Sequence, residues 1–199
     1  MIVIFDYGAG NLRSVQNTLA ELNATYTLVH DAAGLQQATK IILPGVGHFG
    51  QMMRALDALS IRAALLERIA AGVPFLGICL GLQALFESSE EAPEVRGLGI
   101  YPGTVRRFPT TARVPHMGWN QLELRRESKL VRQLPAPPFV YFAHSYYVPA
   151  CDLAAAICTY AEPYTAVLEH NNVFGVQFHP EKSGPVGLQI VRNFLELPC

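Results

Sequence analysis

The chain has 199 residues, half of them hydrophobic and 16% charged, so it holds enough apolar surface for one core of ordinary domain size and is not a mainly disordered chain. Its 15 Lys and Arg residues against 16 Asp and Glu residues leave a net charge of -1, which disfavours binding to nucleic acid. The apolar stretches are too short to cross a membrane and no basic segment precedes the first apolar run, so we expect a cytoplasmic protein with no membrane association.

Short apolar runs alternate with segments of helical periodicity in the N-terminal half, as in βαβ units. Strands are predicted at residues 2–5, 26–29, 41–43 and 75–78. A helix is predicted over residues 12–22, with Asn11 as its cap and Asn23 at its end, and a second helical region over residues 49–71, interrupted at Ser60.

The C-terminal half is rich in β-type segments, at residues 104–108, 121–124, 139–148, 154–160, 166–169 and 173–177. Residues 171–172 are predicted as a tight turn, residues 135–138 as a stiff proline-rich loop, and residues 186–197 as a closing helix. The pattern predicts a single α/β domain over residues 1–199, with a mixed, mostly parallel sheet flanked by helices.

Cys79 lies in a G-x-C-x-G pattern, residues 77–81, between a predicted buried strand and a predicted helix that continues through Leu85 and Phe86. A nucleophile elbow has this layout: the reactive residue lies on a sharp turn that only neighbouring glycines allow, and the start of the next helix favours a thiolate. A buried structural cysteine at the end of a core strand explains the same five residues equally well, so other residues must decide.

A cysteine nucleophile needs a base, and the base needs an orienting group. His179 and Glu181 follow the predicted strand at residues 173–177, with Pro180 between them. Because residues i and i+2 of an extended segment project to the same side, Glu181 can hold one ring nitrogen of His179 while the other faces the sulfur. Beside the elbow, this pair favours a triad of Cys79, His179 and Glu181 over an ordinary surface histidine.

A glycine-rich turn at residues 43–47 follows another predicted strand. The carboxyl ends of parallel strands converge on one crevice, so the N–H groups of Val46 or Gly47, together with that of Leu80, are candidates for an oxyanion hole. Taken alone, Pro44 and Gly45 are typical of any turn.

The other cysteines are Cys151, Cys158 and Cys199, and none has a flanking glycine. No C-x-x-C pair and no histidine at metal-ligand spacing accompanies them, so neither a metal site nor a disulfide scaffold is expected.

Two segments, residues 77–83 and Phe178-His179-Pro180-Glu181, together resemble those of the class I, or triad, glutamine amidotransferases. This family has an α/β sheet flanked by helices. Segments spread along the chain are similar to the glutaminase subunits of imidazole glycerol phosphate synthases: residues 5–12, 43–48, 115–120, 144–147 and 179–183. The elbow alone fits the amidotransferases of anthranilate, pyridoxal phosphate or GMP synthesis as well, whereas residues 117–120 and 144–147 favour the histidine pathway.

This resemblance implies hydrolysis of glutamine to glutamate and ammonia, and transfer of the ammonia to a (β/α)8-barrel cyclase in a heterodimer. The cyclase forms imidazole glycerol phosphate and an aminoimidazole carboxamide ribotide. In this chain Cys79 is then the nucleophile, His179 moves protons and Glu181 orients His179. Matching positions of the glutamine pocket are Gln83, Glu91, His144, Ser145 and Tyr146, and those facing the cyclase are Asn11, Trp119, Asn120 and Lys182. No cofactor and no metal is implied.

Two alternatives remain open from the sequence. One is a nonenzymatic α/β ligand-binding module in which Cys79 is structural and inert to iodoacetamide. The other is a free-standing cysteine hydrolase that uses the same triad on γ-glutamyl peptides.

Overall fold

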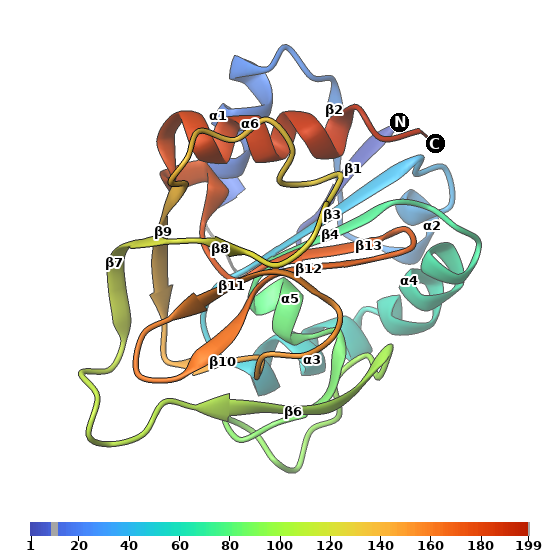
Figure 1. Cartoon of the computed structure of the whole chain (residues 1–199). Coiled ribbons are helices and arrows are strands. Elements are labelled where there is room, and N and C mark those ends of the chain that lie inside the picture. Colours follow the sequence, from blue (N-terminus) through green and yellow to red (C-terminus); the bar gives the residue numbers. More distant parts are fainter. Residues whose placement is uncertain (9–11, 199) are drawn as a thin grey trace.

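In the computed structural model, which describes residues 1–8 and 12–198, an eight-stranded sheet runs through the middle of the molecule (Figure 1). Its parallel part has the order β2 (Tyr26–Val29), β1 (Ile2–Phe5), β3 (Lys40–Gly45), β4 (Phe75–Cys79) and β13 (Val173–Val176). Antiparallel strands continue it as β12 (Pro163–His170), β11 (Ala154–Thr159) and β8 (Glu123–Leu124). The prediction of a mixed, mostly parallel α/β sheet is confirmed.

Helices cover both faces of this sheet (Figure 1). On one face lie α1 (Leu12–Glu21) and α6 (Gly184–Leu195), and on the other lie α2 (Ala32–Leu35), α3 (Phe49–Ala58), α4 (Ile61–Ala70) and α5 (Leu80–Gln83). None of the helices among the described residues combines the length and the apolarity needed to span a bilayer.

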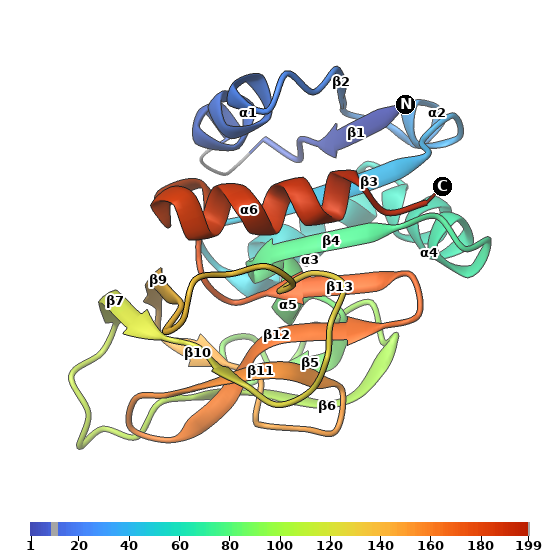
Figure 2. The ribbon, with the colours of Figure 1, turned by 45° about the horizontal axis from the view of Figure 1, so that its top comes forward.

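Strand residues alternate between two hydrophobic cores, one under each helical layer. In β3, Ile41 and Leu43 point into the core below α3 and α4, whereas Ile42 points into the core below α6. Ile190 and Phe194 of α6 fill that second core, and Figure 2 shows α6 lying across the sheet. Burial on both faces explains why the parallel strands are continuous apolar runs in the sequence.

Two small sheets flank the antiparallel side. One joins β10 (Tyr146–Tyr147), β6 (Tyr101–Arg107) and β5 (Phe86–Ser89), and the other pairs β7 (His116–Gln121) with β9 (Phe139–His144). The predicted strand at residues 139–148 is thus two strands in different sheets, and the one predicted at 121–124 is the end of β7 followed by β8.

The helix predicted to continue through Leu85 and Phe86 is wrong. Helix α5 ends at Gln83 and Phe86 begins β5. The reason is tertiary pairing: the carbonyl of Ala84 accepts from Leu98 N at 2.7 Å, and that of Leu85 accepts from Ile100 N at 2.9 Å. These carbonyls bond to a distant segment and not to a next helical turn, so a helix-like apolar spacing ends in a strand.

The short helix α2 was not predicted. Its N-terminal residue Asp31 caps it, since the carboxylate accepts from Gly34 N at 2.8 Å. A single turn of four residues carries too little periodicity to be recognised in the sequence.

Candidate active site

Cys79 lies on a strained turn where β4 ends and α5 begins. Its φ of +54° and ψ of -105° are rare for a residue with a side chain and cost on the order of 1–3 kcal/mol. A Cβ on Gly81 would lie 2.1 Å from the Leu43 carbonyl oxygen, and one on Gly77 would lie 2.4 Å from the Gly81 carbonyl oxygen. The glycines of the G-x-C-x-G pattern are therefore required by backbone contacts between the turn and its neighbours.

Helix α5 is only four residues long. The predicted help from a helix dipole at Cys79 is therefore small, because the dipole sums aligned peptide units.

His179 and Glu181 are paired beside Cys79. Nδ1 of His179 lies 2.8 Å from Oε1 of Glu181, and the two side chains are 4% and 3% exposed. The 3-10 turn η1 (Pro180–Lys182) brings the carboxylate back toward the ring. Burial opposes a charge on His179, but hydrogen bonds to Cys79 and Glu181 more than offset it and raise the pKa of His179 to about 10. This arrangement stabilises an imidazolium next to the sulfur at neutral pH.

A cavity of about 180 Å³ opens at Cys79. It gathers the candidate oxyanion-hole and glutamine-pocket positions into one wall: Val46, Gly47, Leu80, Gln83, Glu91, His144, Ser145 and Tyr146. Pro115, Met117 and Ala143 also line it. The sequence interpretation named Pro115 and Met117 only as part of the family-like segment at residues 115–120, without a place in the pocket, and did not single out Ala143. Met117 and Ala143 are a cross-strand pair of β7 and β9, and two isolated apolar residues give no signal that a pocket lies between them.

Glu91 and His144 have protein partners as well as a place in the cavity wall. Oε2 of Glu91 accepts from Phe49 N at 2.7 Å, at the start of α3. Nδ1 of His144 lies 2.8 Å from the Tyr146 carbonyl oxygen and Nε2 lies 3.4 Å from the Tyr164 hydroxyl. Both ring nitrogens of His144 are thus engaged, and the ring shapes the turn at residues 144–146.

Burial keeps two histidines of this region neutral. It lowers the pKa of His116 to about 4 and that of His144 to about 3. Tyr164, which is fully buried, hydrogen-bonds both rings and contacts His116 Nδ1 at 3.2 Å. The sequence interpretation included His116 in the family-like segment at residues 115–120 but gave it no role, and it did not single out Tyr164, which is far away in the chain.

Gln177 is a further residue at the sulfur that the sequence interpretation missed. It is fully buried, and its Nε2 lies 3.7 Å from Sγ of Cys79. An amide at the end of the otherwise apolar segment 173–177, two residues before His179, was the signal available in the sequence.

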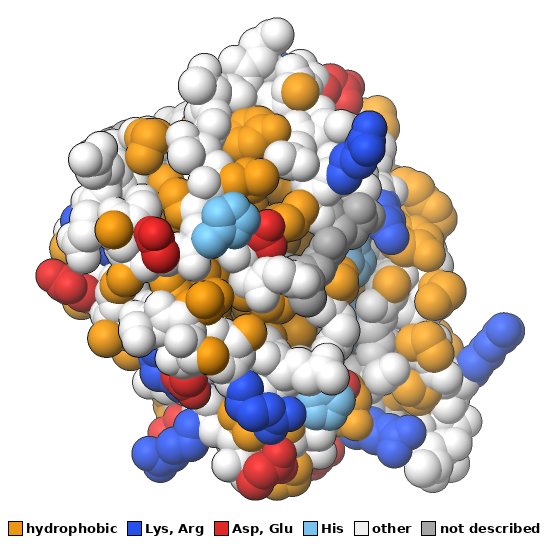
Figure 3. All heavy atoms as spheres, turned by 180° about the vertical axis from the view of Figure 1, so that it is seen from behind, with side chains coloured by type: hydrophobic (Ala, Val, Ile, Leu, Met, Phe, Trp, Pro, Cys, Tyr) orange, Lys and Arg blue, Asp and Glu red, His pale blue; other side chains and the backbone are white. Residues whose placement is uncertain are grey.

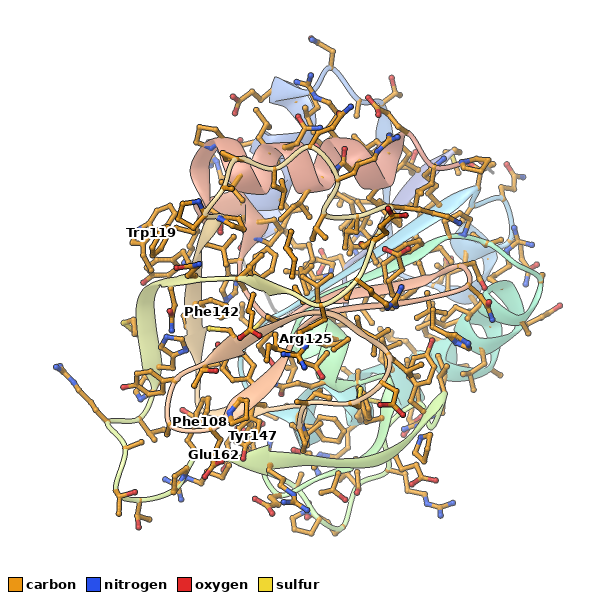
Figure 4. The ribbon with its side chains drawn as sticks, in the orientation of Figure 1. Phe108, Trp119, Arg125, Phe142, Tyr147 and Glu162 are labelled. Carbon is orange, nitrogen blue, oxygen red and sulfur yellow. The ribbon has the colours of Figure 1, made fainter. Side chains whose placement is uncertain are left out.

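The candidate cyclase-facing residues lie in different surroundings. Trp119 is 56% exposed at the edge of the molecule (Figure 4) and meets the Tyr141 ring edge-on at 6.2 Å. Lys182 Nζ lies 5.8 Å from the centre of the same ring. Asn120, the next residue of β7, donates to the Thr159 carbonyl at 3.1 Å instead of joining this cluster. Asn11 lies outside the described residues.

We call Trp119, Tyr141 and Lys182 the Trp119 cluster. It adjoins the triad, because Tyr141 O accepts from His179 N at 2.9 Å and Lys182 follows Glu181 directly.

On the opposite side of the molecule from Figure 1, acidic and basic side chains are interspersed and hydrophobic side chains fill much of the area between them (Figure 3).

Comparison with known proteins agrees with this geometry. The family model for glutamine amidotransferase class-I matches residues 3–197. An imidazole glycerol phosphate synthase subunit HisH from Methanothermobacter thermautotrophicus is 47% identical, over 99% of this chain and 98% of its own length. A subunit of the same name from Deinococcus radiodurans is 45% identical, over 97% of this chain and 92% of its own length.

Solved structures show the same fold at low sequence identity. A crystal structure of a glutamine amidotransferase matches with a TM-score of 0.78 at 20% identity and covers 98% of both chains. The structure of PurLQS from Thermotoga maritima matches with a TM-score of 0.72 at 20% identity, over 98% of this chain and 96% of the other. The chain belongs to the class I glutamine amidotransferases, within the family of imidazole glycerol phosphate synthase HisH subunits.

Proposed function

We propose that this chain hydrolyses glutamine to glutamate and ammonia, and that it supplies the ammonia to a cyclase subunit in histidine biosynthesis. The observation that carries the proposal is the buried pair of His179 and Glu181 beside Cys79 at the wall of the cavity. The names of the relatives agree with it, since they are subunits of imidazole glycerol phosphate synthase.

The reaction needs only groups of this chain. The Cys79 thiolate attacks the side-chain amide carbon of glutamine and forms a C–S bond, and the carbonyl electrons move onto oxygen. N–H groups of Val46 or Gly47 and of Leu80 are proposed to stabilise that oxyanion. The His179 imidazolium then gives its proton to the leaving nitrogen, and ammonia departs from a glutamyl thioester.

Hydrolysis of the thioester completes the cycle. Neutral His179 takes a proton from water as the oxygen attacks the thioester carbon, and the C–S bond breaks to return the thiolate. Glutamate leaves and His179 is again an imidazolium. Glu181 holds the ring in one orientation through both steps and stabilises its charge.

The cavity has chemistry suited to the amino-acid end of glutamine. Glu91 is the acidic residue among those that line it, and its carboxylate is a partner for the α-ammonium group. The Ser145 hydroxyl, the Oε1 acceptor of Gln83 and Tyr146 line the same cavity and offer hydrogen bonds to the remaining polar groups. We propose that His144 acts indirectly, by holding the turn at residues 144–146.

The Trp119 cluster is the proposed docking surface for a (β/α)8-barrel cyclase. An exposed tryptophan supported by a second ring is the type of residue that anchors protein interfaces. Met117, which is 65% exposed and lines the cavity, lies two residues from Trp119 in β7, so a partner on this surface adjoins the cavity mouth. The expected setting of this complex is the cytoplasm.

Isotope transfer tests the function. The chain is mixed with a cognate cyclase and its ribotide substrate, and glutamine labelled with ¹⁵N at the side-chain amide is the only nitrogen source. The proposal predicts labelled imidazole glycerol phosphate and one glutamate per product. Glutamate release without labelled product contradicts transfer to this cyclase, and release from γ-glutamyl peptides in preference to glutamine favours the free-standing hydrolase.

A further inference from the structure

A continuous row of buried hydrogen bonds leads from the turn at residues 144–146 to the sulfur of Cys79. The Tyr146 carbonyl oxygen accepts from Gln83 Nε2 at 2.8 Å. The same Gln83 nitrogen donates to Gln177 Oε1 at 3.1 Å, and Gln177 Nε2 lies 3.7 Å from Cys79 Sγ. Gln83 and Gln177 are 3% and 0% exposed, so these bonds are shielded from water.

The backbone carbonyl fixes the direction of every bond in this row. A carbonyl only accepts, so the amide nitrogen of Gln83 must face Tyr146. That nitrogen also faces Gln177, which must therefore present its oxygen to Gln83. The NH₂ group of Gln177 is left pointing at Cys79, because a flipped amide would set two donors against each other.

The Cys79 sulfur is the hydrogen-bond acceptor for the Gln177 amide. Among the residues that the structure describes, Cys79 Sγ is the acceptor recorded for Gln177 Nε2, and this nitrogen is not among the buried atoms that lack a partner. A donor buried this deeply costs free energy unless it is paired, and a thiolate is a stronger acceptor than a thiol.

We propose that Gln177 is a catalytic residue that donates its amide N–H to the Cys79 sulfur and favours the thiolate, with its direction set by Gln83 and the Tyr146 carbonyl. This inference rests on the proposed function for its role in turnover. The donor assists twice, because the thiolate is the attacking group in the first step and the leaving group when the thioester is hydrolysed. It also leaves His179 free to deliver its proton to the departing ammonia.

The test compares the pH dependence of Cys79 alkylation by iodoacetamide in the wild type and in Gln177→Met. Methionine keeps a side chain of similar length and a weak sulfur acceptor near Gln83, but it has no donor. We expect the midpoint of the alkylation curve to move to higher pH by about one unit, and kcat/KM for glutamine to fall about tenfold at neutral pH. The matched control Asn193→Leu also removes a fully buried amide, away from Cys79, and should lower Tm without moving the alkylation curve.

An unchanged alkylation curve in folded Gln177→Met overturns the inference. If that variant does not fold, the wild type decides by NMR: the side-chain NH₂ signals of Gln177 should shift with the same midpoint as alkylation and stay constant in Cys79→Ser. Signals that do not follow the thiol would overturn it as well. The proposed function is tested separately, by glutamate release from the wild type with its cyclase. If no glutamate is released, the proposed function fails, whereas the difference in alkylation midpoint between the wild type and Gln177→Met can still be observed.

Discussion

Oε1 of Glu181 lies 2.8 Å from Nδ1 of His179, with both side chains almost completely buried. This pairing leaves Nε2 as the ring nitrogen that faces Cys79, and it contributes to the raised pKa of His179. A histidine that is charged at neutral pH beside a cysteine is the acid that a departing ammonia needs.

Replacement of Glu181 by glutamine should move the alkaline limb of activity to lower pH. His179 must be protonated to act as an acid, so activity of the wild type falls as pH rises through about 10. The amide introduced by Glu181→Gln lacks the negative charge that supports the imidazolium, so His179 loses its proton at a lower pH. The pH profile of kcat/KM for glutamine measures this shift.

Glu181→Gln should also retain more activity than His179→Ala, because removal of an orienting residue costs less than removal of the base. An equal or larger loss in Glu181→Gln would show that the carboxylate has another role in the reaction.

Gly81→Ala should destabilise the fold severely. The added Cβ meets the Leu43 carbonyl oxygen at 2.1 Å, so the turn or β3 must move, and we expect the free energy of unfolding to fall by about 3 kcal/mol or more. Gly72→Ala is the control for backbone strain without a clash: Gly72 has a positive φ, +86°, which Gly81 does not, and no atom lies within 4 Å of an added Cβ. That variant should lose only about 1 kcal/mol in urea unfolding. Equal losses would mean that the contact with the Leu43 carbonyl does not explain the glycine at position 81.

The sequence predicted the elements whose patterns are local and continuous. The apolar runs of β1, β3 and β4 and the amphipathic helices α1 and α6 follow directly from side-chain periodicity. Pairing between distant segments could not be predicted from local patterns. The carbonyl of Ala84 accepts from Leu98 N, so the chain forms β5 where the sequence predicted a helix. The same holds at the site, where Gln177 and Met117 reach the cavity region through contacts between distant strands.

Stability should fall in acid because His116 and His144 are buried as neutral rings. Their pKa values are lowered to about 4 and about 3, whereas an unfolded histidine titrates near 6.5. Between these values the unfolded state binds more protons, so the free energy of unfolding decreases as pH falls from 6.5 toward 3.

His116→Phe isolates one of these contributions. Phenylalanine keeps a ring between Phe142 and Tyr160, which stack on His116 at centroid distances of 4.9 and 4.1 Å, and it removes the titrating group. Urea unfolding measures how much the free energy of unfolding decreases between pH 7 and pH 4. We expect this decrease to be smaller by about 3 kcal/mol in the variant than in the wild type. An equal decrease in the free energy of unfolding in both proteins would mean that His116 is not kept neutral by burial.

Trp119→Ala should weaken binding of the cyclase by about 30-fold, since truncation of an aromatic anchor costs about 2 kcal/mol. Because Trp119 is 56% exposed, Tm and the alkylation of Cys79 should not change. Leu59→Ala is the comparison, as Leu59 is 41% exposed and lies at the end of α3, outside the Trp119 cluster. Titration calorimetry with the cyclase distinguishes the two, and equal affinity of both variants would remove the Trp119 cluster as the interface.

The most direct test of the account is product formation by Cys79→Ala in complex with the cyclase. With glutamine as the nitrogen source, this variant should release no glutamate and make no imidazole glycerol phosphate, whereas Cys151→Ala and Cys158→Ala should behave as the wild type. With an ammonium salt at high pH, the Cys79→Ala complex should form the product again, because only the nitrogen source is lost. Substantial glutamate release by Cys79→Ala, or no rescue by ammonium, would contradict the assignment of Cys79 as the nucleophile that feeds the cyclase.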